Sequence, residues 1–311
     1  MTDFATAQSD IPNTAIDRLM VGAIDLHLHS GPSLLERRLD HVEAGRQAEA
    51  AGMAAVALKD HYYSVTPSVR LLEKYEFSDS PLRLLSGIVL NNAVGGFNTY
   101  AVEHTLKLGG RIVWMPTISA ANHIRQTRRS SALPKGHLPP TALSVLDERG
   151  VLLDSVRSIL DLIARHDAVL ATGHLHLSEI LPLLAEARDR GVSRLLVNHP
   201  SFLVGAEAAD MTELANMGAY LEHCAYMLVD RPDQRHHGAA FKSFIQAGGI
   251  ERTILSSDLG QITHPPPVEG LRALIRLCLE LGYGDEEVRQ MVSVNAATLV
   301  GIDLKSSRGA P

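Results

Sequence analysis

The stretch "GAIDLHLHSGPS", residues 22–33, ends an apolar run with two histidines, His27 and His29, separated by one residue. In an extended strand, residues i and i+2 point to the same face, so both imidazoles leave the backbone side by side. The Ser-Gly-Pro that follows predicts a turn, which places the pair at the end of the strand. This arrangement is typical of a metal site, although an isolated pair also fits an ordinary protein core.

Length and composition set the frame for the whole chain. With 311 residues and 45% hydrophobic content, the chain can bury a large core as one domain, residues 1–311. The net charge of -6 predicts neither nucleic acid nor an anionic membrane as a partner. The 2 cysteines form no disulfide framework or Cys-x-x-Cys motif.

The sequence pattern predicts neither a secretory signal peptide nor a membrane-spanning segment. The first residues carry no basic region followed by an apolar one, and no apolar run is long enough to span a bilayer. We expect a cytoplasmic protein with a small-molecule substrate, which can assemble as a homo-oligomer.

Short apolar runs alternate with segments of helical periodicity, a pattern that predicts βα units around a parallel sheet. The eight expected strands cover residues 21–28, 53–60, 82–90, 110–117, 168–173, 194–199, 219–224 and 252–258. Between them, "DHVEAGRQAEAAG" predicts a helix capped by Asp40, and "SEILPLLAEARDRG" predicts one capped by Ser178. Eight such units close a (β/α)₈ TIM barrel, expected over residues 20–303.

The strand spacing is even except after the fourth strand, where residues 118–153 precede the next helical segment. The end of this insertion, "ALSVLDERGVLL", predicts a small hairpin that turns at Glu148, Arg149 and Gly150. Loops that follow strands lie on the catalytic face of a barrel, so we interpret the insertion as a lid. The alternative is a surface insertion without a chemical role.

Histidines gather where the expected strands end. Of the 15 histidines, seven lie at or just past such an end: His27, His29, His61, His174, His176, His199 and His223. Asp258 ends the eighth strand. Each position alone fits a cap or a turn, but strand ends converge at the mouth of a barrel, and the combined pattern favours a metal centre there.

The chain resembles the amidohydrolase superfamily of metal-dependent (β/α)₈ hydrolases, which place His-x-His on the first strand, histidines on the fifth and sixth, and aspartate on the eighth. The match runs from "IDLHLH" to "SSDLG", and "VSVNAATLVGI" is similar to the closing helix of many members, where Asn295 and Gly301 would serve packing. The resemblance implies five metal ligands: His27, His29, His174, His199 and Asp258. It implies no particular substrate, because the superfamily hosts many reactions.

The chain departs from the dinuclear members at the bridging ligand. Those members use a carboxylated lysine or a glutamate on the third or fourth strand, and neither expected strand ends with one here. The second strand instead ends "ALKDHYYS", where Lys59 and His61 are catalytic candidates. Lys59 would be a carboxylated bridge, a substrate-binding cation, or half of a buried ion pair with Asp60. Glu222 is a further candidate, as a ligand or as a carboxylate behind one.

Imidazole and carboxylate ligands without thiolate suit Zn²⁺, Mn²⁺, Ni²⁺ or Fe²⁺, and we expect one or two ions, with zinc first. Such an ion lowers the pKa of a bound water toward about 7 and polarises the bond under attack. Asp258 would then serve as the general base.

Candidate substrate-binding residues lie in the insertion and around the rim of the expected barrel. They are Tyr62, Tyr63, Asn91, Asn92, His123, Arg125, Arg128, Arg129 and Gln261. Guanidinium groups pair with carboxylate or phosphate, which indicates an anionic small molecule, although clustered arginines also fit a solvated loop or a contact between protomers.

The leading hypothesis is a metal-dependent hydrolase of a small, anionic amide, cyclic imide or lactone. The first alternative is a metal-dependent decarboxylase of a small carboxylic acid, since mononuclear members of the same superfamily use a similar ligand set. The second is a phosphoesterase of the PHP type, because "KDHYY" is similar to a turn of that group, which shares the His-x-His start. The third is a barrel that holds metal only for structure.

Overall fold

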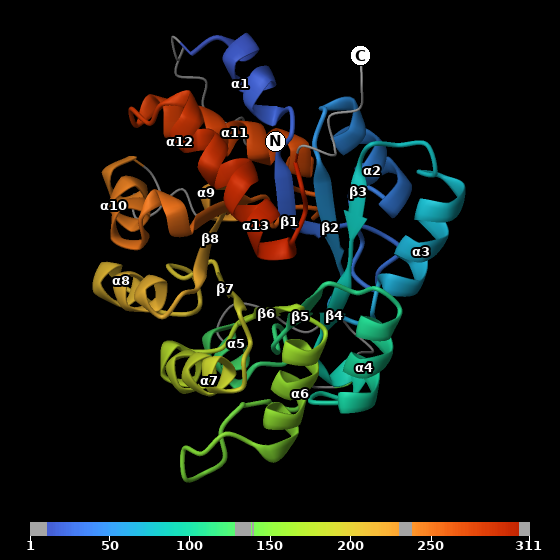
Figure 1. Ribbon diagram of the computed structural model, residues 1–311, viewed down its shortest axis with the longest axis vertical. Helices are drawn as coiled ribbons and strands as arrows, with labels where there is room; N and C mark the ends of the chain where they lie inside the picture. The colour runs from blue at the N-terminus through green and yellow to red at the C-terminus, as the bar shows by residue number, and fades with distance from the viewer. Residues whose placement is uncertain (1–10, 128–137, 139, 230–237, 305–311) are drawn as a thin grey trace. The chain divides into compact units, whose positions relative to one another are not determined.

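The computed structural model describes residues 11–127, 138, 140–229 and 238–304, which form helices and parallel strands (Figure 1). Their contacts divide the chain into two compact units. Unit 1 consists of Met1–Lys59, Pro67–Leu85 and Glu222–Pro311, and unit 2 of Asp60–Thr66 and Ser86–Leu221. The parallel α/β class predicted from the sequence is confirmed.

In unit 1, β1 (Ile24–His29), β2 (Ala55–Lys59) and β3 (Arg83–Leu85) form a parallel sheet in that order. Every residue of β1 and β2 is buried, as is typical of parallel strands covered on both faces. Strand β8 (Tyr220–Cys224), whose last residues belong to unit 1, is hydrogen-bonded to β9 (Thr253–Ser256). These strands bring the carboxyl ends of β1, β8 and β9 into one unit.

Helices cover the strands of unit 1. They are α1 (Asn13–Met20), α2 (His41–Ala50), α3 (Thr66–Tyr75), α9 (Tyr226–Val229), α10 (Gly238–Gly248), α11 (Pro267–Glu280), α12 (Asp285–Arg289) and α13 (Asn295–Val300), with a 3₁₀ turn η2 (Ile250–Arg252) and a π-helical turn η3 (Gln290–Val294). The predicted cap of α2 is confirmed, because Asp40 accepts from the Glu43 amide at 2.8 Å. Asn295 donates to the carbonyls of Ile250 and Thr253, in keeping with its expected packing role.

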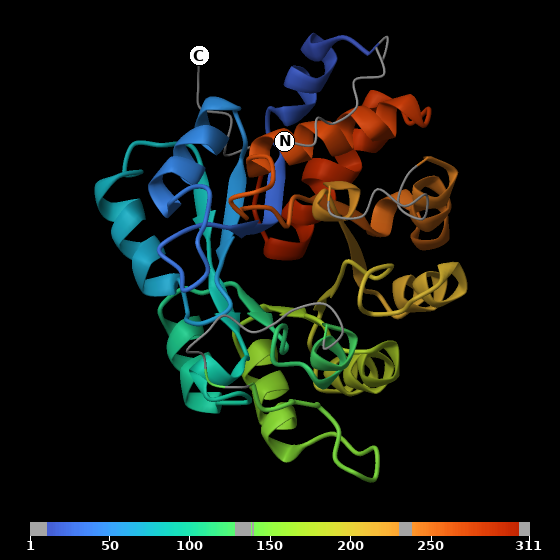
Figure 2. The same ribbon diagram turned by 180° about the vertical axis from the view of Figure 1, so that it is seen from behind.

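Unit 2 contains β4 (Gly87–Val89), β5 (Ile112–Trp114), β6 (Val169–Ala171) and β7 (Arg194–Asn198), paired in parallel in that order. Its helices are η1 (Asn92–Val94), α4 (Thr99–Lys107), α5 (Ala121–Thr127), α6 (Asp154–Arg165), α7 (Leu177–Asp189) and α8 (Ala208–Asn216), and Figure 2 shows α4 beside α6 and α6 beside α7. Within the described ranges of both units, no helix combines the length and apolarity needed to cross a membrane.

The structure corrects two local predictions. The cap of α7 is His176 rather than Ser178: the His176 ring accepts from the Ser178 amide, and Glu179 accepts from the His176 amide at 3.2 Å. The expected third strand, residues 82–90, is two short strands, β3 and β4, that belong to different sheets. The break falls at Ser86, between two apolar runs that are each too short for periodicity to separate them into two strands.

The insertion after β5 is described only in part. Residues 128–137 and 139, which include Arg128 and Arg129, lie outside the described residues. The predicted hairpin is confirmed by an antiparallel bridge between Leu146 and Leu152. Its turn is closed by a hydrogen bond from the Asp147 amide to the Val151 carbonyl at 2.8 Å.

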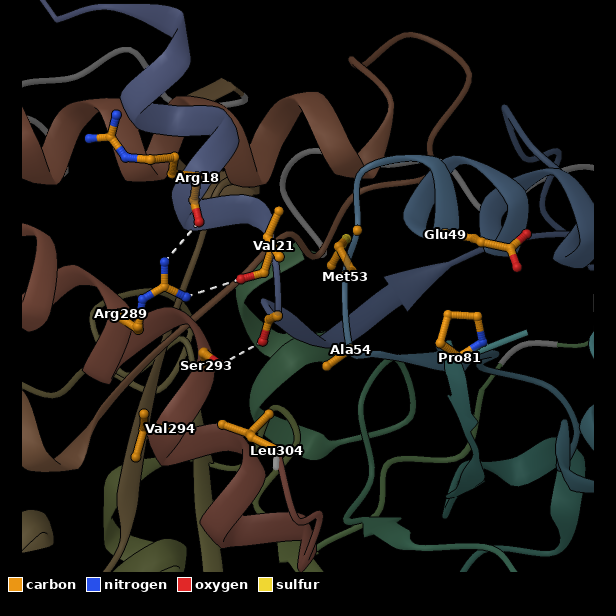
Figure 3. A pocket seen from close by; sticks show the side chains of 12 residues that line it. Arg18, Val21, Glu49, Met53, Ala54, Pro81, Arg289, Ser293, Val294 and Leu304 are labelled. Carbon is orange, nitrogen blue, oxygen red and sulfur yellow. Dashed lines mark hydrogen bonds between the residues drawn. The ribbon is translucent and has the colours of Figure 1, made fainter. Parts of the chain in front are cut away.

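A pocket of about 480 Å³ lies within unit 1 at the amino ends of its strands (Figure 3). Gly22 lines it just before β1, and Ala54 just before β2. Arg289, the last residue of α12, donates to the Val21 carbonyl at 3.0 Å and so ties the end of that helix to the chain entering β1. Because His29 is the last residue of β1, this pocket lies at the opposite end of the strand from the histidine pair.

Gly87 offers a test of the close approach between β4 and β5. A Cβ atom at this position would lie 1.8 Å from the Ile112 carbonyl oxygen, so Gly87→Ala forces the paired strands apart. We expect the free energy of unfolding to fall by roughly 1–3 kcal/mol or more, measured by urea denaturation.

Gly284→Ala is the matched control, because a Cβ there meets only Glu287 Oε2 at 3.9 Å. Its change should stay below about 1 kcal/mol. Equal effects of the two substitutions would contradict the tight approach at Gly87.

Candidate metal centre

Three ligand atoms of unit 1 converge at the carboxyl ends of β1 and β9. Asp258 Oδ1 lies 2.9 Å from His27 Nε2 and 3.2 Å from His29 Nε2. All three residues are buried, and their ligand atoms lie within 4.8 Å of one another. The alternation of β1 points both imidazoles to one face, as the sequence predicted. The set is compact enough to share a single ion.

Each imidazole is held through its other ring nitrogen. His27 Nδ1 lies 2.9 Å from Glu222 Oε2, and His29 Nδ1 lies 3.2 Å from the Lys59 carbonyl oxygen. Both partners are acceptors, so each Nδ1 carries a proton, and Nε2 is the ring nitrogen on the side where an ion could bind. Glu222 therefore orients a candidate ligand, which fits the second of the two roles considered for it from the sequence.

The backbone that carries Asp258 is unusual. Asp258 has φ of 50°, a left-handed conformation that non-glycine residues rarely adopt. Its amide donates to the His27 carbonyl at 2.7 Å. Gly260 follows with φ of +139°, and a Cβ there would lie 1.8 Å from the His29 carbonyl oxygen. Backbone strain of this kind is concentrated at functional sites.

Asp25 supports this arrangement and was missed by the sequence reasoning. Its Oδ1 accepts from the amides of His27 and Ser257, each at 3.0 Å, and so links β1 to the residues after β9. Burial raises its pKa to about 6. Asp25 precedes His27 and His29 at the same two-residue spacing, and this periodicity was the available signal.

The charges of the cluster are strongly coupled. Burial lowers the pKa of His27, but attraction to Asp258 outweighs it and raises the value to about 9. For His29, burial and the nearby Arg37 lower the pKa to about 3. Burial would raise the pKa of Asp258, yet the charge and hydrogen bond of His27 hold it well below its usual range. In the absence of an ion, a proton on His27 therefore balances the Asp258 carboxylate.

Lys59 lies inside the same cluster. Its side chain is buried, with Nζ 2.8 Å from His27 Nε2. Burial lowers its pKa, while Asp258 and Glu222 act in the opposite direction. Lys59 therefore stands beside the atom that would ligate an ion, a position that fits both a bridging and a charge-balancing role.

The donor set fits a divalent ion of the kind expected from the sequence, because two imidazole nitrogens and one carboxylate oxygen suit zinc and its neighbours. A second convergent group joins His27, Glu222 and Cys224, with Cys224 Sγ 4.0 Å from His27 Nδ1. That nitrogen donates to Glu222, so we assign the ion to the Nε2 side. Both groups found among the described residues belong to unit 1.

Four histidines gather within unit 2. His174 Nδ1 lies 2.8 Å from His123 Nδ1, and the two rings stack with centroids 4.8 Å apart. The ring centroid of His199 is 5.0 Å from that of His174, and the His61 ring is 6.3 Å from it. His199 also has positive φ, 32°, and its Nδ1 lies 3.2 Å from the Phe202 carbonyl oxygen. The structure thus groups the expected ligands His174 and His199 with two other candidates.

Asn91, expected to bind substrate, uses its carboxamide inside unit 2. Its Nδ2 donates to the His61 carbonyl and to Thr117 Oγ1, and its Oδ1 accepts from the amides of Thr117 and Ser119. Thr117 Oγ1 in turn lies 2.8 Å from His61 Nδ1. The contacts of Asn91 fit a residue that positions His61.

The remaining rim candidates are scattered. Arg125 is exposed and donates to Asn122 Oδ1 at 3.1 Å, within its own helix α5. The Tyr62 amide donates to Asp60 Oδ1, and the Asn92 amide donates to Ser119 Oγ. Tyr63 is half-buried.

Gln261 is the rim candidate that lies with the unit 1 cluster. Its Nε2 is 3.5 Å from the Asp258 carbonyl oxygen. It is half-buried, in the loop that follows β9.

Several solved structures are similar in fold to this chain. An amidohydrolase from Pseudomonas aeruginosa is 12% identical, with a TM-score of 0.63, over 96% of this chain and 100% of that one. A protein from Pseudomonas putida described as a putative 2-pyrone-4,6-dicarboxylic acid hydrolase is 15% identical, with a TM-score of 0.57. The match covers 90% of this chain and 98% of that one. L-hydantoinase from Arthrobacter aurescens is 14% identical, with a TM-score of 0.57, and the match covers 90% of this chain and 71% of that one. The chain therefore shares the fold of these three proteins.

Within that fold, the chain belongs to DUF6282, a family of unknown function whose model matches residues 22–222. The matched region contains the His-x-His pair and Glu222 and ends before Asp258. A comparison with curated proteins gives no match.

The charge state of His27 predicts how metal binding depends on pH. A metal-ligating histidine must be deprotonated, and the pKa of His27 is about 9, whereas that of His29 is about 3. One proton is therefore displaced throughout the neutral range. The apparent affinity for Zn²⁺ should rise roughly tenfold for each pH unit between about 6 and 8.

Calorimetric titration in buffers of different ionisation enthalpy measures both the affinity and the proton release. An affinity that does not change with pH over this interval would show that His27 is not the ligand that competes with protons.

Lys59 gives a second prediction. Removing a charged group from a buried cluster leaves its partners uncompensated, so Lys59→Ala should lower the stability of the metal-free protein by roughly 3–5 kcal/mol. If Lys59 balances charge, the Lys59→Ala variant should bind as much metal as the parent protein. Lys107→Ala, at an exposed pair with Glu103, is the control and should change stability by less than about 1 kcal/mol.

Loss of one of two ions from Lys59→Ala, with activity restored by short-chain carboxylic acids, would instead identify Lys59 as a carboxylated bridge.

Proposed function

We propose that this protein is a metal-dependent hydrolase of a small, anionic amide, cyclic imide or lactone. The observation that carries the proposal is the convergence of His27 Nε2, His29 Nε2 and Asp258 Oδ1 at the carboxyl ends of two neighbouring strands. The site is built for coordination, since Glu222 and the Lys59 carbonyl fix the imidazole tautomers. The names of two fold neighbours, a hydantoinase and a 2-pyrone-4,6-dicarboxylic acid hydrolase, support this substrate class.

When bound, a divalent ion lowers the pKa of water to about 7 and polarises the carbonyl of the substrate. Asp258 acts as the general base: its low pKa keeps the carboxylate ionised at neutral pH, and its oxygen is held against both histidines. Lys59 places Nζ 2.8 Å from His27 Nε2 and interacts electrostatically with the same carboxylate. Asp25 keeps His27 and the backbone before Asp258 in register.

Several finer features remain predictions from the sequence. We propose that eight strands close a (β/α)₈ barrel, that residues 118–153 form its lid, and that His174 and His199 complete the five-ligand centre. The contact of His199 Nδ1 with the Phe202 carbonyl supports coordination through Nε2. Zinc is the ion to test first. The cytoplasmic location and the homo-oligomer also remain predictions.

Asp258→Asn tests the function directly. An amide keeps the shape of the side chain but cannot accept a proton near neutral pH, so kcat should fall by roughly 10²- to 10⁴-fold. The histidines should still retain zinc. The parent is first assayed against a panel of hydantoins, dihydropyrimidines and lactones, with products followed by mass spectrometry for the addition of water.

His104→Ala, on the exposed side of α4, is the control and should leave the rate unchanged. A zinc-loaded Asp258→Asn protein within a few-fold of the parent would refute the assignment of the base. Release of CO₂ by the parent would favour the decarboxylase, and release of phosphate from generic esters would favour the phosphoesterase.

A further inference from the structure

A guanidinium group lies against the metal centre of unit 1. Arg37, in the loop after β1, places Nη2 3.4 Å from His29 Nδ1. Resting on the proposed hydrolase function, we propose that Arg37 binds a carboxylate of the substrate and that Gln261 accepts an N–H from the same molecule. The two residues would make the enzyme specific for small carboxylated amides and imides.

The backbone around Arg37 is held at several points. Gly31 donates to the Leu39 carbonyl at 2.8 Å, and the Arg38 amide donates to the Gly260 carbonyl at 2.9 Å. Arg37 itself pairs with Gln261 in an antiparallel bridge. The loops that follow His29 and Asp258 are therefore joined to each other. A guanidinium on such a backbone is preorganised, which reduces the entropy lost when it binds an anion.

The electrostatic setting favours an anion. Because His29 Nδ1 donates to the Lys59 carbonyl, its contact with Arg37 places two donors side by side rather than forming a hydrogen bond. Arg37 also acts as a like charge on Lys59. A divalent ion on His29 would add further positive charge at short range. A carboxylate beside Arg37 relieves this repulsion and makes charge-assisted hydrogen bonds to the guanidinium fork.

Gln261 adds an acceptor next to this cation. Its Oε1 atom is buried and accepts no hydrogen bond from any residue that the structure describes. A buried acceptor without a donor costs free energy, which a ligand N–H can recover. Guanidinium and carboxamide together therefore fit a carboxylate and an amide N–H carried by one substrate.

The geometry also limits the size of the substrate. Arg37 approaches His29 from the Nδ1 side, while Asp258 lies at Nε2 of the same ring. Arg37 and Asp258 thus lie at opposite ends of one imidazole, a separation that favours a small substrate. By contrast, Arg125 is exposed and donates within its own helix, so we assign the anion to Arg37.

Two metal-binding probes of equal length test the inference on the full-length, zinc-loaded protein. Succinic monohydroxamic acid carries a free carboxylate, and its primary amide is the neutral counterpart. Calorimetry should show that the parent binds the acid roughly ten- to a hundredfold more tightly, the range of a hydrogen bond to a charged group. Arg37→Gln should remove this preference, and Arg37→Lys should keep only part of it, because lysine lacks the fork.

Arg125→Gln is the matched control and should keep the full preference. Gln261→Leu should weaken both probes to a similar extent, since both carry the hydroxamate N–H. Zinc content and circular dichroism establish that each variant is folded and loaded.

Two results would overturn the inference while leaving the metal centre in place: equal affinity of the parent for acid and amide, or an unchanged preference in Arg37→Gln. Failure of the parent to bind zinc, or of the zinc-loaded parent to bind either probe, would refute the proposed hydrolase, and the inference would fall with it.

Discussion

The hydrogen bond from the Asp258 amide to the His27 carbonyl is the contact on which the candidate metal centre depends. It joins the ends of β1 and β9, which are separated by most of the chain, and brings the Asp258 carboxylate to both imidazoles. The left-handed backbone at Asp258 and the glycine at position 260 are required for this approach. Asp25 strengthens the same junction, because its carboxylate accepts hydrogen bonds from the amides of His27 in β1 and Ser257 after β9.

Buried charge is the second constraint. His27, Lys59, Glu222 and Asp258 are all buried, and such a cluster is costly unless its charges balance. Here a proton on His27 balances Asp258, and an ion at the same nitrogen would replace that proton. A purely structural cluster could be replaced by apolar residues at little cost. Its position at the strand ends is better explained by chemistry, because parallel α/β folds bind ligands beyond the carboxyl ends of their strands.

The histidines of unit 2 repeat the same construction. His61, His174 and His199 each have Nδ1 within hydrogen-bonding distance of another group of the protein, as do His27 and His29 in unit 1. This shared orientation leaves Nε2 as the candidate coordinating nitrogen of these rings. It also gives the residues around them, such as Thr117, Asn91 and Glu222, the common task of fixing imidazole tautomers.

The sequence by itself determined the parallel α/β class, most strand positions, and the His-x-His pair with its aspartate, because periodicity and strand-end position are local patterns. It did not reveal that β3 and β4 belong to different sheets, since sheet membership depends on which strands pair in space. Only the tertiary structure assigned Glu222 to the Nδ1 side of His27 and placed Arg37 beside His29. These contacts join residues from separate loops and strands, so their pairing depends on how the chain folds rather than on local spacing.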